Sequence, residues 1–520
     1  MAGRIALRGR IVTMDQRDTV LPDGVLYVGA GGVIEAVRPA AEPPPAGFAG
    51  VPVTGTGATV YPGLIELHNH LPYDVLQLWQ VPKRFDNRGQ WGGTKDYRRL
   101  VTGPMTALGH DPLLMPAVVR YVEAKALLNG TTTSQGIALF SNAGARRMYR
   151  GVVRNVEQPK DPALPAAASR IADVDADDAR RFLDRLNRKQ RLLLHLAEGV
   201  DDVARGHFRA LEFEPGRWAI TENLVGIHCT GLGSEDFKIL ADHGGSMVWS
   251  PLSNLLLYGR TADIAAARAA GVRVALGSDW SVSGSKGLLG ELKAARLAAA
   301  GTVTEQELVA MATRDAARIL RWDGALGMLR PGLRADLLAV ATTDADPYRG
   351  LVAARDGDIR LVAIDGTARY GEAGLMRSLA APGARLEEPL PERLVDLDDQ
   401  DGDPLVAGVT LAEATRRLTG ALASLPTLGV GPGPLAVPGE RPTWRLALDE
   451  IQQTGAELRP RLPFGDRPSG PVIDLAPPAA LTALGLDGLT AGADAAYRTT
   501  LAAEANLPTG LRTALVAQLA

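Results

Sequence analysis

Hydrophobic and polar residues alternate in short runs over residues 1–57. The segments RIALRGRIVTMD, GVLYVGAG and GVIEAVRP switch between apolar and polar side chains and are separated by glycine and aspartate. Alternation of period two, broken by turn residues, is typical of β-strands joined as hairpins. The same pattern returns over 334–370, in RADLLAVAT, DIRLVAIDG and TARYG. The two flanks, 1–57 and 325–375, are therefore predicted to fold together into one small β-sandwich domain.

Residues 58–324 show a different pattern, in which eight short apolar runs alternate with segments of helical periodicity. The helical segments include 113–129 and 305–320, and Thr304 with Glu307 forms a capping box at the start of the second. Strands that alternate with helices over such a length predict an α/β fold of the (β/α)8 TIM-barrel type. The fourth run, SRIADV, has the weakest strand pattern.

Residues 376–520 differ again, because proline and glycine interrupt the pattern repeatedly, as in PGPLAVPGERPTW and LPFGDRPSGPV. Helical patterns remain over 411–425 and in LRTALVAQLA. No catalytic motif stands in this part of the sequence. We therefore predict a C-terminal extension of unknown role that wraps or caps another surface.

Composition narrows the class of protein. The 520-residue chain has a net charge of −3, with 46% hydrophobic and 22% charged residues, and this balance gives no sign of a nucleic-acid or membrane partner. Cys229 is the only cysteine, which excludes a disulfide framework and a thiolate metal cluster. The N-terminus lacks the apolar segment of a secretory signal, and no apolar run reaches about 18 residues. We expect a cytoplasmic protein.

Candidate chemistry begins in GLIELHNHLPYD, where His68 and His70 are two of only seven histidines. Side chains two positions apart on a strand point to the same side, so both imidazoles can bind one metal ion. Two histidines in an ordinary polar loop are the alternative that this motif alone leaves open.

Polar residues at the ends of other predicted strands bear on this choice. They are His195 on the fifth strand, with Glu198 just after it, His228 on the sixth and Asp279 on the eighth. The C-terminal ends of TIM-barrel strands meet at one face, where catalytic groups are found. Any one of these residues alone is compatible with a buried polar group of the core. Together they favour one site of nitrogen and oxygen donors, suited to Zn²⁺ or Fe²⁺.

Longer stretches around these residues resemble the amidohydrolase superfamily, specifically its cytosine deaminase and aminohydrolase/chlorohydrolase branch. The matching stretches are YPGLIELHNH, HLAEG, GIHCTGL, SPLSNLLLYG and LGSDWSVSGSKGLLGEL, and the β-rich flanks match as well. The resemblance covers roughly residues 1–375. It implies a metal-dependent hydrolase that acts on a carbon–nitrogen bond other than a peptide bond.

The resemblance also implies one divalent metal ion, with zinc favoured and iron or manganese as alternatives. Its ligands would be His68, His70, His195 and Asp279. Relatives with two metal ions bridge them through a lysine at the end of strand four, and SRIADV contains no lysine. His228 would then hold water or a developing oxyanion instead of binding metal.

Catalytic roles follow from the same resemblance. A bound divalent metal lowers the pKa of water to about 7, and Asp279 would be the general base that takes the water proton. Glu198 would protonate a ring or amidine nitrogen of the substrate, which makes the attacked carbon more electrophilic. A surface ion pair, or a charge at a helix N-terminus, is the alternative for Glu198.

Substrate contacts are predicted around the same mouth of the barrel. The loop after the first strand, LPYDVLQLWQVPKRFDNRGQW, is long, aromatic and basic. Trp79 in this loop, Gln135 after strand two and Trp280 after the aspartate are predicted to contact the substrate. Trp280 stands where the resembling family commonly has a small residue, so we expect it to narrow the pocket.

We therefore predict a hydrolase of a small, N-heterocyclic molecule, with deamination as the leading reaction. Hydrolysis of a cyclic amide or imidazolone-type ring is the closest alternative. A non-catalytic barrel that binds a ligand or a partner is an alternative of another class. A homo-oligomer fits the resemblance, in which dimers and larger assemblies are common.

Overall fold

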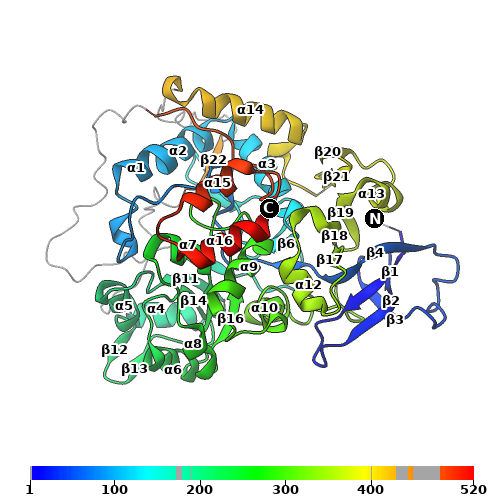
Figure 1. The fold of residues 1–520 in the computed structure, drawn as a ribbon, viewed down its shortest axis with the longest axis horizontal. Helices are drawn as coiled ribbons and strands as arrows, with labels where there is room; N and C mark the ends of the chain where they lie inside the picture. The colour runs from blue at the N-terminus through cyan, green and yellow to red at the C-terminus, as the bar shows by residue number, and fades with distance from the viewer. Residues whose placement is uncertain (1–2, 171–178, 189, 400, 429–442, 449–480) are drawn as a thin grey trace.

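A computed structural model describes residues 3–170, 179–188, 190–399, 401–428, 443–448 and 481–520 (Figure 1). The fourth predicted strand, SRIADV, falls only partly within these ranges, because residues 171–174 lie outside them. Among the residues described, no helix combines the length and apolar character needed to cross a membrane.

Eight short parallel strands occupy the central part of the chain. Three form one sheet, in the order β5 (Leu64–Ile65), β6 (Thr131–Ser134) and β9 (Arg154–Asn155). Five form another, in the order β10 (Ala168–Arg170), β11 (Leu192–Leu196), β14 (Leu224–His228), β15 (Ser246–Trp249) and β16 (Arg273–Leu276). The order of the strands in each sheet follows their order along the chain.

Backbone hydrogen bonds continue across both gaps between these sheets. The Ala167 N–H donates to the Val156 carbonyl at 2.8 Å, between β9 and β10. At the other gap, the His70 N–H donates to the Asp279 carbonyl at 2.7 Å, and the Asp279 N–H donates to the His68 carbonyl at 3.1 Å. The segment after β5 therefore lies directly beside the segment after β16, and both carry predicted site residues.

Helices follow most of these strands. They are α3 (Met115–Leu128), α4 (Ala179–Leu186), α5 (Asp202–Arg209), α6 (Ser234–Asp242), α7 (Pro251–Tyr258), α8 (Ile264–Ala269) and α9 (Leu288–Ala299). The predicted capping box is present, since the Thr304 hydroxyl accepts from the Glu307 N–H and the Glu307 carboxylate accepts from the Thr304 N–H.

The helix predicted over 305–320 is divided into α10 (Glu305–Met311) and α11 (Arg314–Leu320). The physical reason lies at Ala312, whose carbonyl accepts a hydrogen bond from the Ile65 N–H at 2.8 Å. The Ala312 carbonyl is hydrogen-bonded to β5 instead of continuing the helix. The next residue, Thr313, departs from helical geometry with φ −137° and ψ −96°. Helical periodicity in the sequence could not reveal this long-range contact.

Strands from both flanks share one nine-stranded sheet. Its order is β20 (Leu386–Leu390), β21 (Arg393–Asp396), β19 (Thr367–Glu372), β18 (Ile359–Ile364), β17 (Leu337–Val340), β4 (Val53–Pro62), β1 (Ile5–Val12), β2 (Val20–Val28) and β3 (Ile34–Pro39). The flanks meet where β17 pairs antiparallel with β4. The sheet also takes in β20 and β21, which come from the predicted extension, and α13 (Ala373–Leu379) packs against it. The domain boundaries stay a prediction.

Further elements surround the barrel strands. They are α1 (Lys95–Tyr97), α2 (Gly103–His110), β7 (Ala138–Ser141), β8 (Arg146–Met148), β12 (Glu212–Glu214), β13 (Arg217–Trp218), α12 (Pro347–Ala353), α14 (Leu411–Ala423), β22 (Trp444–Leu446), α15 (Ala495–Ala503) and α16 (Thr509–Leu519). Figure 1 shows α14 beside α2 and α3, and α16 beside α9, and these pairs are in contact. The C-terminal part of the chain thus packs against helices of the central part.

Candidate metal centre and active site

The ends of the central strands bring the predicted site residues together. The His68 Nε2 atom lies 3.0 Å from the Asp279 Oδ1 atom, and the His70 Nε2 atom lies 3.4 Å from the same oxygen. The ring centroids of His68 and His195 are 4.7 Å apart. Ligand atoms of His68, His70 and His195 all lie within 4.8 Å of one another, and so do those of His68, His228 and Asp279.

Two of these residues, His228 and Asp279, have unusual backbone conformations. His228 at the end of β14 has φ 68°, and Asp279 after β16 has φ 67°. Non-glycine residues seldom adopt this left-handed region, and such conformations concentrate at functional sites. Gly277 lets two segments of the site approach each other closely. A Cβ atom at this position would lie 2.5 Å from the His68 Cβ atom. Only glycine lets the His68 segment pack this closely against the start of the Asp279 loop.

The direction of the hydrogen bonds made by Gln135 shows that the Nδ1 atom of His68 carries a proton. The Gln135 Oε1 atom accepts from the Asn69 N–H at 3.0 Å, so this atom is the amide oxygen and an acceptor. It also lies 3.2 Å from the His68 Nδ1 atom, which must therefore carry a proton. The Nε2 atom makes no hydrogen bond and lies 3.0 Å from the Asp279 Oδ1 atom, so that the neutral form of the ring directs a lone pair at the carboxylate.

Two buried acceptor atoms face each other at this point, a histidine nitrogen and a carboxylate oxygen. Such a contact is unfavourable unless a cation lies between the atoms. Imidazole nitrogens and a carboxylate are the donors that Zn²⁺ and related divalent ions prefer. A backbone-anchored amide that holds the other ring nitrogen is a common support for a metal-binding histidine. The residues therefore fit a divalent metal ion.

The electrostatics of these groups agree with such a centre. Burial, followed by the neighbouring His68, lowers the pKa of His195 well below its usual value, so the ring is neutral near pH 7. Burial by itself would raise the pKa of Asp279, but the neighbouring histidines, His68 above all, outweigh burial and hold that pKa well below the usual range. Neutral imidazoles and an ionised carboxylate are the forms that bind metal.

His228 is in the opposite hydrogen-bonding state to His68. The indole N–H of Trp249 can only donate, and it donates to the Thr261 hydroxyl at 2.6 Å. That hydroxyl donates to the Asn254 Oδ1 atom at 3.3 Å, which leaves the Asn254 amide N–H to donate to the His228 Nδ1 atom at 2.9 Å. The proton of neutral His228 is therefore on Nε2. Burial lowers the pKa of His228 to about 4, so this neutral form holds at pH 7.

Glu198 is buried beside His228, and only one of its two carboxylate oxygens makes a hydrogen bond. Its Oε1 atom accepts from the Tyr258 hydroxyl at 2.7 Å, and that hydroxyl accepts from the Trp91 indole N–H at 2.9 Å. The Oε2 atom makes no hydrogen bond. It lies 3.8 Å from the His228 Nε2 atom and 3.6 Å from the Arg88 Nε atom. One carboxylate oxygen is thus fixed, while the other faces the cavity.

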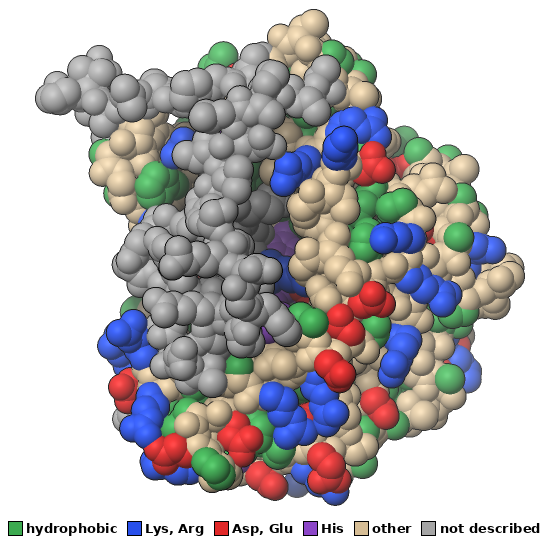
Figure 2. Space-filling view, turned by 90° about the vertical axis from the view of Figure 1, so that its left-hand side faces the viewer, with side chains coloured by type: hydrophobic (Ala, Val, Ile, Leu, Met, Phe, Trp, Pro, Cys, Tyr) green, Lys and Arg blue, Asp and Glu red, His purple; other side chains and the backbone are tan. Residues whose placement is uncertain are grey.

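A small cavity opens over these groups, with a volume of about 90 Å³. Figure 2 shows histidine side chains inside a hollow of the molecular surface. The lining residues are His70, Arg88, Trp91, Gly92, Tyr97, His195, Glu198, His228, Asp279 and Trp280. Histidine nitrogens, two carboxylates and flat aromatic side chains therefore share one small cavity.

The three predicted substrate contacts lie at different depths. Trp280 lines the cavity, with its ring centroid 5.0 Å from that of His70. Trp79 is buried and stacks on Phe85 at 6.2 Å, and it is not among the residues that line the cavity. Gln135 also lies outside the lining, since its amide contacts His68, Asn69 and Ser169. The substrate contacts of all three stay predictions.

Sequence reasoning missed Trp91, Tyr97 and Tyr258 as site residues. Asn254 and Tyr258 stand four residues apart on α7, so they project from the same face of that helix. One contacts His228 and the other contacts Glu198. The spacing of these two residues in SPLSNLLLYG was a signal that could have identified Tyr258.

The loop after the first strand is hydrogen-bonded to the segment around Glu198 through backbone groups. The Arg88 N–H donates to the Glu198 carbonyl at 3.2 Å, and the Val200 N–H donates to the Asp86 carbonyl at 2.6 Å. The Asn87 side-chain amide donates to the Asp201 carboxylate at 2.6 Å. These bonds hold Arg88, Trp91 and Tyr97 over the cavity.

Comparisons with known proteins agree with this description. The family model described as Amidohydrolase family matches residues 205–369. A 5-methylthioadenosine/S-adenosylhomocysteine deaminase of Symbiobacterium thermophilum is 26% identical over 419 residues, which cover 70% of this chain and 92% of the relative. The structure of a zinc-bound adenosine deaminase of Xanthomonas campestris has a TM-score of 0.56 at 19% identity, over 80% of this chain and 98% of that one. An atrazine chlorohydrolase of Arthrobacter aurescens in complex with zinc has a TM-score of 0.55 at 20% identity, over 70% and 94%.

Fold and site define a metal-dependent hydrolase that acts on carbon–nitrogen bonds. The structural neighbours imply a TIM barrel with a separate domain. Its family match over residues 205–369, its curated relatives and its structural neighbours all make the chain similar to the aminohydrolase branch of the amidohydrolase superfamily. The chain therefore uses a divalent metal ion and a small-molecule substrate, and the alternative of a non-catalytic barrel is set aside.

Proposed function

We propose that the protein is a hydrolytic deaminase of a small N-heterocyclic compound. The observation that carries the proposal is the Oε2 atom of Glu198, which is buried and makes no hydrogen bond, in a residue that lines the same cavity as Asp279. A carboxyl group placed in this way can give a proton to a ring nitrogen of a bound heterocycle. The relatives named as deaminases support the same reaction.

His68, His70, His195 and Asp279 would hold the divalent metal ion, for which we propose zinc, with iron or manganese as alternatives. When bound, such an ion supplies Lewis-acid chemistry and lowers the pKa of water to about 7. The role of Gln135 follows from its contacts, since its amide oxygen keeps the Nε2 atom of His68 free of a proton. These contacts give Gln135 a supporting role beside a proposed ligand, in addition to its predicted substrate contact.

The remaining steps are proton transfers by side chains. Asp279 takes a proton from the attacking water, because its carboxylate lies beside the histidines that would hold the metal ion. Glu198 protonates the ring nitrogen next to the amino-bearing carbon, and the Nε2–H group of His228 donates to the incoming oxygen. The C–O bond forms, the proton held by Asp279 passes to the amino group, and the C–N bond breaks to release ammonia. The hydroxyl proton of the product returns to Glu198 as the C=O bond forms, which restores both carboxyl groups to their starting states.

The size and lining of the cavity favour a flat ring. Its volume of about 90 Å³ is well below the roughly 300–1,000 Å³ that is usual for ligand sites. The aromatic residues Trp91, Tyr97 and Trp280 contribute faces and edges for stacking. We infer that the reacting ring enters this space, while any larger substituent stays at the mouth.

An assay for released ammonia tests the proposal. The purified protein, loaded with zinc, iron or manganese in turn, is offered aminated heterocycles, including 5-methylthioadenosine, S-adenosylhomocysteine, free nucleobases and amino-triazines. We expect ammonia together with the mass change that replaces an amino group by an oxygen. A ring-opened product without ammonia would establish cyclic-amide hydrolysis instead.

The division into domains belongs to the same proposal. We infer a metal-dependent hydrolase barrel over 58–324, a β domain built from 1–57 and 325–375, and a C-terminal extension over 376–520. The pairing of β4 with β17 supports the β domain. Cytoplasmic location and a homo-oligomer stay predictions, and so does the expectation of no nucleic-acid or membrane partner.

A further inference from the structure

The segment 481–520 reaches the loop that follows the first barrel strand. The Asp487 N–H donates to the Val75 carbonyl at 3.0 Å, and Leu486 forms an antiparallel bridge with Leu76. The Tyr121 hydroxyl donates to the Asp487 carbonyl at 2.5 Å. Asp487 is fully buried and enters the molecule between this loop and α3.

Two buried lysines converge on the Asp487 side chain. The Nζ atoms of Lys125 and Lys286 each lie 2.5 Å from the same carboxylate oxygen, Oδ2. The side chains of all three residues are 1% exposed. Lys286 also pairs with Asp494 at 2.9 Å. A buried ammonium group is stable only when it is paired and hydrogen-bonded, so Lys125 depends on Asp487, whereas Lys286 shares its charge between Asp487 and Asp494.

Lys125 carries this contact to the two loops that hold proposed metal ligands. Its ammonium donates to the Asp74 carbonyl at 2.8 Å and to the Ser281 hydroxyl at 2.5 Å. The Ser281 N–H and hydroxyl donate to the Asp74 carboxylate at 2.7 and 3.0 Å. Asp74 follows His70 by four residues, and Ser281 follows Asp279 by two.

We propose that Asp487 is a positioning residue for the metal centre, acting through Lys125 on the loops that carry His70 and Asp279. The proposal rests on the proposed metal site. It assigns a segment of the C-terminal extension the role of holding two active-site loops in position. Misplacement of catalytic groups by about 1 Å can cost a hundredfold in rate, so a contact that fixes two ligand loops together has a functional effect.

The substitution Asp487→Asn tests this inference, because it removes the charge and keeps the size of the side chain. Affinity for zinc is measured by competition with a chromophoric chelator, which requires no substrate. We expect affinity to fall about 10- to 100-fold, as for supporting residues of other metal sites. We also expect kcat to fall more than KM changes, and Asp487→Glu, which keeps the charge, to recover part of both losses.

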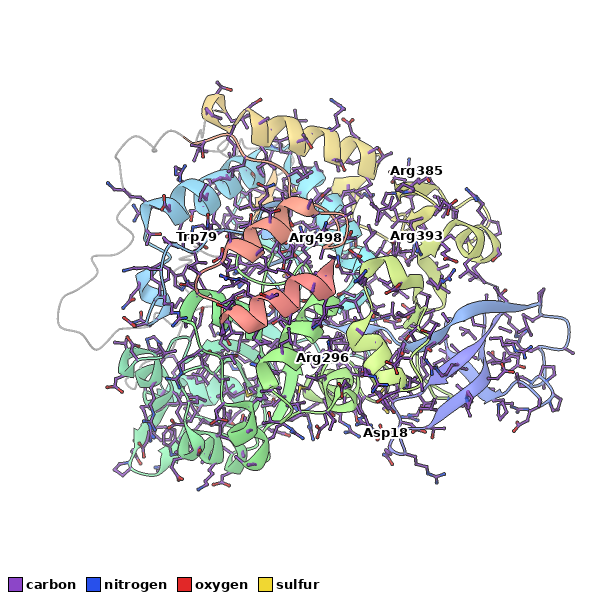
Figure 3. All side chains as sticks on the ribbon, viewed as in Figure 1. Asp18, Trp79, Arg296, Arg385, Arg393 and Arg498 are labelled. Atoms are coloured by element: carbon purple, nitrogen blue, oxygen red, sulfur yellow. The ribbon has the colours of Figure 1, made fainter. Side chains whose placement is uncertain are left out.

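A matched control removes another contact of the same segment. Gln518 on α16 accepts from the Arg296 guanidinium at 2.5 Å, far along the segment from Asp487 (Figure 3 labels Arg296). Gln518→Ala should leave zinc affinity and kcat within about twofold of the unsubstituted protein. An Asp487→Asn variant that also stays within that limit would overturn the inference.

A second variant covers the case in which Asp487→Asn does not fold. Ser281→Ala leaves the Asp487 ion pairs in place and removes one hydroxyl between Lys125 and Asp74. It should reduce zinc affinity severalfold, and unchanged affinity contradicts the inference. If the unsubstituted protein binds zinc and both variants bind it equally well, only this inference fails. If the unsubstituted protein binds no divalent metal, the proposed function fails as well.

Discussion

His68 and His228 lie side by side, with ring centroids 5.0 Å apart, yet they offer opposite groups to the cavity. In its neutral form His68 presents a lone pair on Nε2, because the Gln135 oxygen accepts a hydrogen bond from its Nδ1–H group. His228 presents an N–H group, because the Asn254 amide donates to its Nδ1 atom. Two supporting amides of opposite hydrogen-bond direction thus distinguish a proposed metal ligand from a proposed hydrogen-bond donor. The same residue type serves two purposes within one site.

Asn254→Leu should lower kcat about 10- to 100-fold without loss of bound metal. The substitution removes the donor that keeps the His228 proton on Nε2, so less of the ring can donate to the developing oxyanion. Steady-state kinetics and elemental analysis give the two quantities. Nitrogen-15 spectra of the seven histidines should show the His228 ring nitrogens exchanging their protonated and bare states.

Thr261 provides the control, because Thr261→Ser keeps the hydroxyl that orients Asn254, whereas Thr261→Val removes it. The serine variant should match the unsubstituted protein, and the valine variant should resemble Asn254→Leu. Equal activity in all variants would mean that the hydrogen-bond direction at His228 has no catalytic role.

Much of this site could be predicted from residues at strand ends. His195, His228 and Asp279 end apolar runs in the sequence, and the structure brings them within reach of one another. The supporting residues could not be predicted in the same way. Gln135 and Ser169 are linked by a hydrogen bond across 34 residues, and nothing in either local pattern indicates it.

At the scale of elements, α7 is attached at both of its ends. Its N-terminal Leu252 N–H donates to the Glu291 carboxylate of α9 at 3.0 Å, while Asn254 and Tyr258 face His228 and Glu198. Helix N-termini favour acidic partners because their first N–H groups have no partner within the helix. Glu291 thus sets the position of a helix that carries two supporting residues.

The Glu291 carboxyl makes stability dependent on pH. Burial raises its pKa to about 8, against opposing hydrogen bonds from Ser285 and Leu252. The folded state therefore keeps a proton between about pH 4.5 and 8 that the unfolded state loses, so this group stabilises less as the pH rises through that window. The slope reaches at most about 1.4 kcal/mol per pH unit.

Glu291→Gln should remove this contribution. Urea unfolding at both ends of the window should show that the variant gains stability relative to the unsubstituted protein as the pH rises. Glu235→Gln, at an exposed carboxyl paired with Lys238, serves as a control with no such trend. A constant difference between Glu291→Gln and the unsubstituted protein at both pH values contradicts the assignment.

The sequence predicted the helices and strands themselves better than the points at which they break or join another sheet. The α/β alternation and the β-rich flanks follow from local periodicity, and the helix predicted over 113–129 is present as α3. The break between α10 and α11 arises from a bond to Ile65, and the strands β20 and β21 join a sheet begun near the N-terminus. Both depend on contacts between distant segments, which no local pattern specifies.

At the scale of the whole molecule, a buried ion pair connects the barrel strands to the nine-stranded sheet. The Arg154 guanidinium on β9 lies 2.9 Å from the Asp336 carboxylate, which precedes β17, and 3.0 Å from Asp365 after β18. Asp336 also accepts from the Asp365 N–H at 2.9 Å. The two parts of the fold therefore share a charge network in which Arg154 and Asp336 are buried and Asp365 is partly exposed.

Arg154→Met should lower the free energy of unfolding by about 3–5 kcal/mol, because it leaves Asp336 buried without its partner. Chemical denaturation measures the change. Adding Asp336→Asn to Arg154→Met should recover part of the loss. Arg8→Met, which removes an exposed ion pair with Asp23, should have little effect. Equal effects of the buried and exposed substitutions would contradict this account.

The Lys286–Asp487 contact joins residues that stand 201 positions apart in the chain. Ribosomes add about 5–20 residues per second, so Lys286 waits roughly 10–40 seconds for its partner to be made. During this time the barrel strands have been synthesised, but the two ammonium groups have no counterion from Asp487. We expect the loops of Asp74 and Ser281 to reach their final positions only after Asp487 emerges, which makes the metal centre one of the last parts of the molecule to mature.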